Sequence, residues 1–326
     1  MRKKQRVLNA VNKVVRPLGV RVEFASTYRT ATAVPLDAGV DLSCLRDALT
    51  PRIEMAILGS IGDRFTIPSN LGAHVRIFSL DAIAPADGAA ADQNIVSVRD
   101  VIAPRAGPLK FIERVATGVS SYLEPRQDMI DLYGLQRFYI PKQEHDVEAI
   151  TLSDLAGRHG VPGWDYIRTD LEGADHAIVR SLGDAVRGAS LVEMELRTEP
   201  FYRDEPYLHE VLSYMFQHGF EVLDLKPERW RAKTANMLYD TRGRVAFTNT
   251  VFVNRAKEGG SPKEVLRHAL VLGMMGYANF AERVLEPLAR SHAEQVRTLG
   301  RLFYGQASST YLPFSAMPQM THGTGD

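Results

Sequence analysis

Short apolar runs alternate with helical or turn-rich segments along most of the chain from Ile53 onward. This alternation is typical of an α/β sheet, in which strands and helices follow one another along the sequence. The longer runs predict seven strands, at 53–58, 75–80, 95–102, 164–170, 191–196, 220–225 and 250–254. Two shorter runs predict smaller added strands, at 109–113 and 147–150. The pattern therefore favours an α/β fold.

Helical spacing and cap residues predict helices between and after these strands. Thr151-Leu152-Ser153-Asp154 has the form of a capping box and is expected to begin a helix that ends near Gly160. A second helix follows Asp175, and a third is predicted to begin at Pro206, because proline is favoured in a first helical turn. Ser261-Pro262-Lys263-Glu264 is expected to cap a further helix, which one or two more helices follow.

Composition limits the class of protein. The chain has 326 residues, of which 45% are apolar and 24% charged, so we expect a soluble catalytic domain with appendages. Lys and Arg together number 39, as do Asp and Glu, so no overall field favours nucleic acid as a partner. The single cysteine, Cys44, excludes an intramolecular disulfide and fits a reducing compartment.

The sequence shows neither a membrane span nor a signal peptide, and we therefore expect a cytoplasmic protein. No apolar run approaches the roughly 20 residues of a membrane span, and the first residues lack the apolar segment of a signal peptide. The first 21 residues carry seven basic side chains and no acid, with apolar residues at helical spacing up to Pro17. Such a basic amphipathic helix could contact a membrane surface peripherally, or it could pack on its own domain with a solvated basic face.

The most informative stretch runs from Trp164 to Asp175. A strand-like run ends in Asp170 and Glu172, and a helical pattern begins directly after Gly173. Carboxylates at the carboxyl end of a strand lie where open α/β sheets bind their ligands. For the acids of the first helical turn, stabilisation of the helix is the alternative interpretation, and we prefer it for Asp175.

This stretch resembles the signature strand of the FkbM-type methyltransferases, which reads roughly Ile-Lys-x-Asp-x-Glu-Gly-Ala-Glu. Further segments resemble the same family in the same order, at 59–62, 80–81, 118–125, 147–155 and 192–195. The resemblance implies a Rossmann-like class I methyltransferase sheet with helices on both faces, an N-terminal helix and a C-terminal helical tail. We expect a basic helix and lead-in over 1–50, a methyltransferase domain over 51–255, and a helical extension over 256–326.

The resemblance implies S-adenosylmethionine as cofactor. This donor carries no phosphate and needs close backbone approach and an acid for its ribose hydroxyls. Gly59, Ser60 and Gly62 follow the first strand, and Asp81 ends the second, close to the ~20-residue spacing of a ribose-binding acid. Glycines here also fit the needs of a tight turn.

Two positions of this donor loop depart from the family. Ile57 stands where the family usually has an acid, and Asp63 where it often has a glycine. The family's acid helps to orient the loop and the amine of the donor. Without this acid, we expect the loop to bind the donor more weakly or not at all.

The predicted chemistry is methyl transfer to a hydroxyl, in which the protein aligns the oxygen and removes its proton. One of Asp170 and Glu172 is expected to be the base and the other to position donor or acceptor, with Glu195 on the neighbouring strand. The three carboxylates also match a divalent-metal site. Ser120 and Ser121 either line the acceptor pocket or form a serine turn.

We therefore expect an S-adenosylmethionine-dependent O-methyltransferase, and the resemblance implies an acceptor sugar of a glycan, glycolipid or related metabolite. Because of Ile57 and Asp63, a catalytically degenerate binding or scaffold subunit is the alternative. A nicotinamide-dependent oxidoreductase is a third hypothesis, but a full Gly-x-Gly-x-x-Gly does not follow the first strand. The C-terminal helices fit either a homo-oligomer contact or a cap on the sheet.

Overall fold

The computed structural model describes residues 36–59, 67–80, 94–233 and 243–304. All of them belong to the larger of two compact units, Ala33–Asp326. The other unit, Met1–Thr32, lies outside the described residues, as does the basic helix predicted there. No helix of the described ranges is long and apolar enough to cross a membrane.

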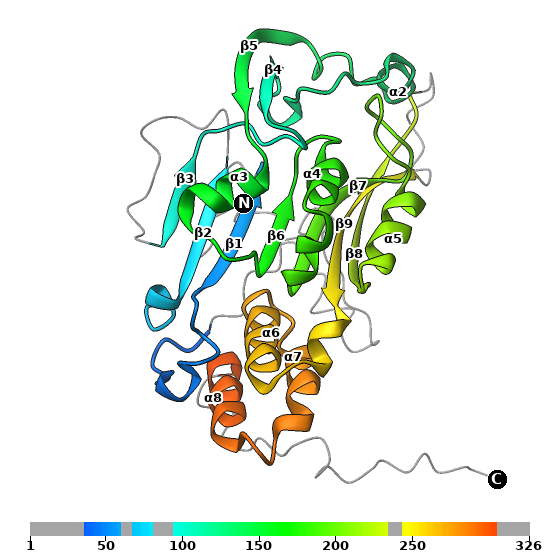
Figure 1. Ribbon diagram of the computed structural model, residues 1–326. Helices are drawn as coiled ribbons and strands as arrows, with labels where there is room; N and C mark the ends of the chain where they lie inside the picture. The colour runs from blue at the N-terminus through cyan, green and yellow to red at the C-terminus, as the bar shows by residue number, and fades with distance from the viewer. Residues whose placement is uncertain (1–35, 60–66, 81–93, 234–242, 305–326) are drawn as a thin grey trace, which may run out of the picture. The chain divides into compact units, whose positions relative to one another are not determined.

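Seven strands form one sheet in the order β3-β2-β1-β6-β7-β9-β8 (Figure 1). Neighbouring strands from β3 to β7 are parallel, and β9 is antiparallel to both β7 and β8. The bounds are β1 Ile53–Leu58, β2 Val75–Leu80, β3 Ile95–Val98, β6 Tyr166–Thr169, β7 Leu191–Arg197, β8 Phe220–Trp230 and β9 Arg244–Asn254. This mainly parallel sheet confirms the predicted Rossmann-like fold.

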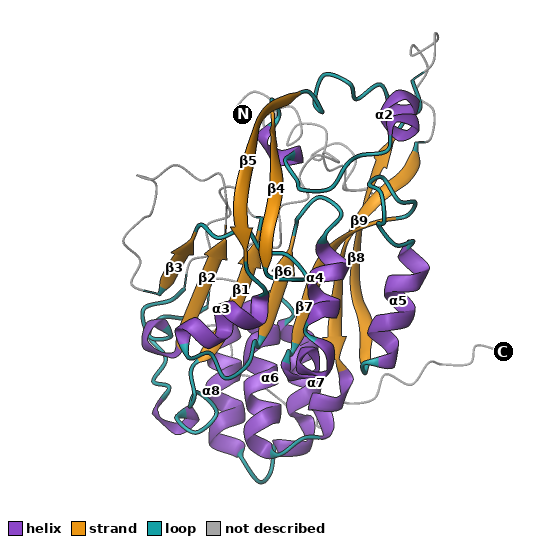
Figure 2. Ribbon diagram, turned by 45° about the horizontal axis from the view of Figure 1, so that its top comes forward, coloured by secondary structure: helices purple, strands orange, loops and turns teal. Residues whose placement is uncertain are grey.

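Helices cover both faces of the sheet (Figure 2). One core contains residues of α3 (Leu152–His159), α4 (Asp175–Ser181) and α5 (Leu208–Gln217). The other contains residues of α6 (Pro262–Met274), α7 (Ala278–Leu285) and α8 (Ala293–Tyr304). Side chains alternate between the cores along a strand, so Ile57 packs in the core of α6–α8 and Leu58 in the core of α3–α5.

Arg267 ties α6 to the beginning of the central strands. Its guanidinium donates to both carboxylate oxygens of Asp165, at 2.5 and 2.6 Å, and to the backbone carbonyls of Ala48 and Arg52. Asp165 in turn accepts the backbone N–H of Glu54 at 2.9 Å. These contacts fix α6 to the N-terminal ends of β1 and β6, whereas the pocket described below lies at the carboxyl ends of these strands.

A second, two-stranded sheet consists of β4 (Gly107–Arg114) and β5 (Pro141–Ala149), which pair antiparallel. Its connection contains α2 (Gln127–Tyr133). We call this unit the arm. Figure 1 shows it beyond the ends of β1 and β6, and Phe111 of the arm shares a pocket with Leu58 and Asp170.

The structure corrects several predicted boundaries. Strand β8 continues past the predicted end at 225 through Pro227 to Trp230, which is tolerated because β8 is an edge strand. Helix α5 begins at Leu208 rather than at Pro206, since the backbone N–H of Tyr207 donates to Glu210 and caps the helix there. The capping boxes at Thr151 and Ser261 are confirmed.

Candidate active site

The site begins where β1 and β6 end side by side. The N–H of Asp170 donates to the carbonyl of Leu58 at 3.0 Å, and the N–H of Gly59 donates to the carbonyl of Leu80 at 2.9 Å. Gly59 has φ +79, and a Cβ there would lie 1.9 Å from the carbonyl oxygen of Asp170. Glycine is therefore required by the contact between the two strand ends, whatever ligand lies above them. The predicted donor residues Ser60, Gly62 and Asp81, like Asp63, lie outside the described residues.

The turn after Asp170 has an unusual backbone. Glu172 adopts a left-handed conformation at φ 51, and Gly173 follows at φ 93. A Cβ on Gly173 would lie 2.6 Å from the ring of Tyr202, so this position also requires glycine. The carboxylate of Asp175 accepts the N–H of Leu171 at 3.2 Å and closes the turn.

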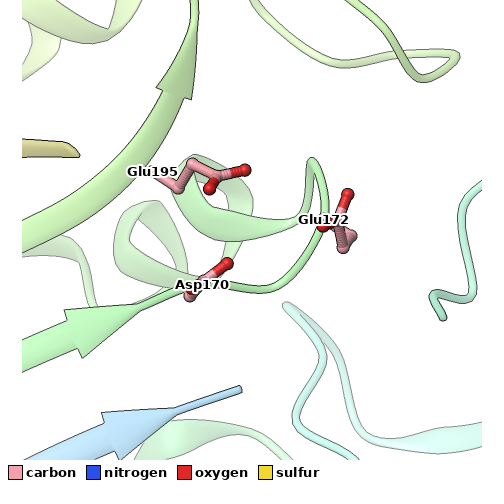
Figure 3. Close-up of side chains that lie close together, drawn as sticks. All are labelled: Asp170, Glu172 and Glu195. Carbon is pink, nitrogen blue, oxygen red and sulfur yellow. The ribbon is translucent and has the colours of Figure 1, made fainter. Parts of the chain in front are cut away.

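This turn brings three predicted carboxylates together. Asp170, Glu172 and Glu195 each place an oxygen within 4.8 Å of the other two. Figure 3 shows them turning toward a common space from the end of β6, the following turn and β7. Strands β6 and β7 pair in parallel, with Thr169 opposite Met194, which sets Glu195 beside Asp170. We call these three residues the carboxylate cluster.

A buried arginine that sequence reasoning missed holds this cluster. Arg197 is 4% exposed, and its Nη2 donates to Glu172 at 2.7 Å and lies 3.0 Å from Glu195. Its Nη1 lies 3.5 Å from Glu205. The Tyr202 hydroxyl also donates to Glu172, at 2.7 Å. Alternation along β7 puts Arg197 on the same face as Glu195, and this signal could have identified it.

Burial and mutual repulsion shape the electrostatics of the site. Burial raises the pKa of Glu195 well above its usual range, against the opposing charge of Arg197, and the charge of Asp170 raises it further. The pKa of Asp175 rises to about 7, mainly through burial and then through the charge of Asp170. Carboxylates beside Asp170 are therefore less favourable as anions than carboxylates in water.

A pocket opens beside the carboxylate cluster. Asp170 and Glu172 line it at the end of β6, and Phe111 lines it from the arm. The predicted acceptor residues Ser120 and Ser121 also line it. Both serines make hydrogen bonds within the protein as well, because Ser120 Oγ accepts the N–H of Arg114 at 3.0 Å and Ser121 Oγ donates to the carbonyl of Glu172 at 3.2 Å.

Asp100 is a further residue of the site that sequence reasoning missed. It follows β3, lines the pocket and accepts a hydrogen bond from Arg158 of α3 at 3.1 Å. The predicted strand at 95–102 hid this position, because β3 ends at Val98 and Asp100 therefore lies beyond the strand end. It adds a carboxylate on the β3 side of the pocket.

The chemistry of the lining residues suits a methyl donor with a positive sulfonium and ammonium and an apolar-faced adenine, such as S-adenosylmethionine. Leu80, Val101 and Ile102 give it apolar walls, and Asp100 and Asp170 give it negative charge. The carboxylate cluster also has the spacing of a divalent-cation site. The guanidinium of Arg197 already supplies positive charge to two of these carboxylates.

The mainly parallel sheet with a pocket at the carboxyl ends of its strands is consistent with a Rossmann-like methyltransferase fold. The family model described as methyltransferase FkbM domain matches residues 100–222. The matched range contains Ser120, Ser121 and the whole carboxylate cluster, confirms the FkbM resemblance there and supports a methyltransferase; the loop at Gly59 precedes it. Neither the search of curated proteins nor that of solved structures gave a match.

Proposed function

We propose that this protein is an S-adenosylmethionine-dependent O-methyltransferase acting on a hydroxyl of a sugar in a glycan, glycolipid or related metabolite. The observation that carries the proposal is the carboxylate cluster at the mouth of a pocket within an FkbM methyltransferase match. The sugar as acceptor comes from the family resemblance. Membrane contact through the first residues and self-association remain predictions.

Asp170 is our candidate for the general base. It lines the pocket, where an acceptor hydroxyl can approach it. Glu172 is less suited, because its Oε2 already accepts hydrogen bonds from both Arg197 and Tyr202. These two donors hold the carboxylate of Glu172 in one orientation, which suits a positioning role. Glu172 therefore positions, while Asp170 accepts the proton.

The other groups of the site prepare this proton transfer. A bound donor supplies a methyl group already activated by the positive sulfur. Asp170 aligns the acceptor hydroxyl and takes its proton, and the buried Glu195, whose pKa is raised by burial, lies beside it. The apolar wall of Val101 and Phe111 limits water beside the reacting oxygen.

The test combines calorimetry with a transfer assay. Wild-type protein is expected to bind S-adenosylmethionine and to label glycolipid or oligosaccharide acceptors from a methyl-tritiated donor. Asp170→Asn should keep donor binding within about threefold but lose transfer by about 10²–10⁴-fold, the usual contribution of a general base. Asp128→Asn, at an exposed carboxylate of α2, is the matched control. Asp81→Ala should weaken donor binding, since Asp81 is the predicted ribose acid.

Absence of donor binding by the folded protein, or donor binding unaffected by Asp81→Ala, would refute the proposal. So would full transfer activity in Asp170→Asn. Each outcome is read against the melting temperature of the variant, which separates loss of function from loss of fold.

A degenerate scaffold protein is the second candidate, and Ile57 favours it. The side chain of Ile57 is 1% exposed and packs in the core of α6–α8, so this position offers no polar group to a donor. This candidate predicts donor-independent binding to a glycan-assembly partner and no turnover with any acceptor. Methyl transfer that is lost in Asp170→Asn would exclude it.

A further inference from the structure

Arg114, at the end of β4, is one of the most deeply buried charged residues of the described chain. It is 2% exposed, although a buried guanidinium is costly unless it is hydrogen-bonded. Its Nη1 donates to the carbonyl of Val119 at 2.8 Å, and its Nη2 donates to the carbonyl of Leu123 at 3.2 Å. The planar guanidinium of arginine can donate to two carbonyls at once from separate nitrogens, whereas lysine has a single ammonium nitrogen.

Both carbonyls belong to one segment, residues 117–125, which we call the pocket loop. Thr117 and Tyr122 of this loop line the pocket together with the two serines. The loop is also bonded to β4 through its backbone, because Ile112 and Ser121 exchange N–H to carbonyl bonds at 3.1 and 3.2 Å. The side chain of Arg114, at the end of β4, therefore holds the pocket loop against this strand.

The pocket loop holds Glu172 at two points. Ser121 Oγ donates to the backbone carbonyl of Glu172 at 3.2 Å. Pro125 forms a β-bridge with Tyr202, and the N–H of Arg203 donates to the carbonyl of Glu124 at 2.9 Å. Tyr202, held in this way, donates its hydroxyl to the Glu172 carboxylate.

These contacts oppose a real conformational cost at Glu172. A non-glycine residue at φ 51 is disfavoured and persists only where surrounding contacts determine it. The two attachments from the pocket loop act on the backbone and on the carboxylate of this residue. Loosening the loop would therefore weaken one contact to the backbone of Glu172 and one to its carboxylate, which would keep only its bond to Arg197.

We propose that Arg114 is a positioning residue, which fixes Glu172 at the pocket by holding the pocket loop, without contacting the reacting atoms. The kinetic part of this proposal rests on the proposed function. Its structural part, the dependence of the loop on Arg114, does not.

Two variants and one control test the proposal. Arg114→Lys keeps the charge and loses the fork, Arg114→Ala leaves a space that added guanidinium can fill, and Arg137→Lys is an exposed arginine of the same region. Hydrogen–deuterium exchange of the pocket loop is expected to accelerate by at least about tenfold in both Arg114 variants and not in the control. The kcat is expected to fall about 10–100-fold, as for a displaced catalytic group, with the KM for donor changed less than about threefold.

Guanidinium at millimolar concentration should restore part of the lost kcat and loop protection in Arg114→Ala, whereas methylammonium should not. Unchanged loop exchange in a folded Arg114 variant would overturn the proposal, whatever the activity. Faster exchange with an unchanged kcat would overturn the link to Glu172. If wild-type protein neither binds donor nor transfers methyl, the proposed function fails, and the exchange measurement alone decides the role of Arg114. If Arg114→Ala does not fold, Arg114→Lys carries the same decision.

Discussion

Replacing Asp175 by asparagine is expected to stabilise the protein at alkaline pH, although Asp175 matches the last acid of the family signature. Its side chain is 2% exposed at the first position of α4. Burial, followed by the charge of Asp170, raises its pKa from 3.8 to about 7. The asparagine oxygen can still accept the N–H of Leu171, so the turn keeps its hydrogen bond.

The magnitude and its sign follow from linkage. Each pKa unit corresponds to about 1.4 kcal/mol, so this shift is worth up to about 4 kcal/mol of folding free energy. Below pH 3.8 Asp175 is protonated in both the folded and the unfolded chain, and the shift has no effect on stability. As the pH rises through 7, the unfolded chain has already ionised and the folded protein bears the full cost. Asparagine does not titrate and avoids this cost.

Urea-induced unfolding of wild type and Asp175→Asn between pH 4 and pH 9 measures the difference. The advantage of the variant should be close to zero at pH 4 and approach about 4 kcal/mol above pH 7, with the m-value unchanged. Buried histidines affect both proteins equally and cancel in the difference. Asp184→Asn, at an exposed carboxylate, should show no such pH dependence. A difference that is constant with pH, or an asparagine variant less stable at pH 9, would refute the reasoning.

Three further predictions concern stability. Gly173→Ala should cost more than about 2 kcal/mol, because its Cβ would meet Tyr202, whereas Gly183→Ala, also at positive φ but in open space, should cost only about 1 kcal/mol; equal costs in urea unfolding would contradict the steric argument. His268 is fully buried with a pKa lowered to about 4 by burial, so between pH 6.5 and 4 wild type should lose about 3 kcal/mol of unfolding free energy more than His268→Leu does, since Asp175 and His176 titrate in both proteins. Arg267→Met should cost about 3–5 kcal/mol by leaving a buried carboxylate unpaired, and a melting temperature lowered by less than a few degrees would speak against it.

The strands that the sequence predicted best are those buried on both faces. Every residue of β1 is buried, and all of them except Glu54 are apolar, so a nearly continuous apolar run marks this strand. The outer half of β8 is partly exposed and contains Pro227, so its residues do not form such a run. Its partner β9 likewise begins at Arg244, before the predicted strand at 250–254.

The site divides in the same way. Asp170, Glu172 and Glu195 could be identified because each follows or ends a predicted strand, and parallel strands bring their ends together. Tyr202 and Arg114 could not be identified in this way, because neither lies at the end of a predicted parallel strand of the main sheet. Their contacts with the site depend on a turn and a loop whose shapes only the tertiary structure reveals. The departure at Ile57 has a physical reason, because an acid there would face the apolar side chains of α6–α8.

That same packing has a consequence for synthesis on the ribosome. The strands β1 and β2 share one core with α6, α7 and α8, the last of which ends at Tyr304. A nascent chain that has released only the strands keeps one apolar face of the sheet uncovered until almost the whole described chain has emerged. Folding of this sheet is therefore completed only once α8 has left the ribosome, and the period before that is when a chaperone is most needed.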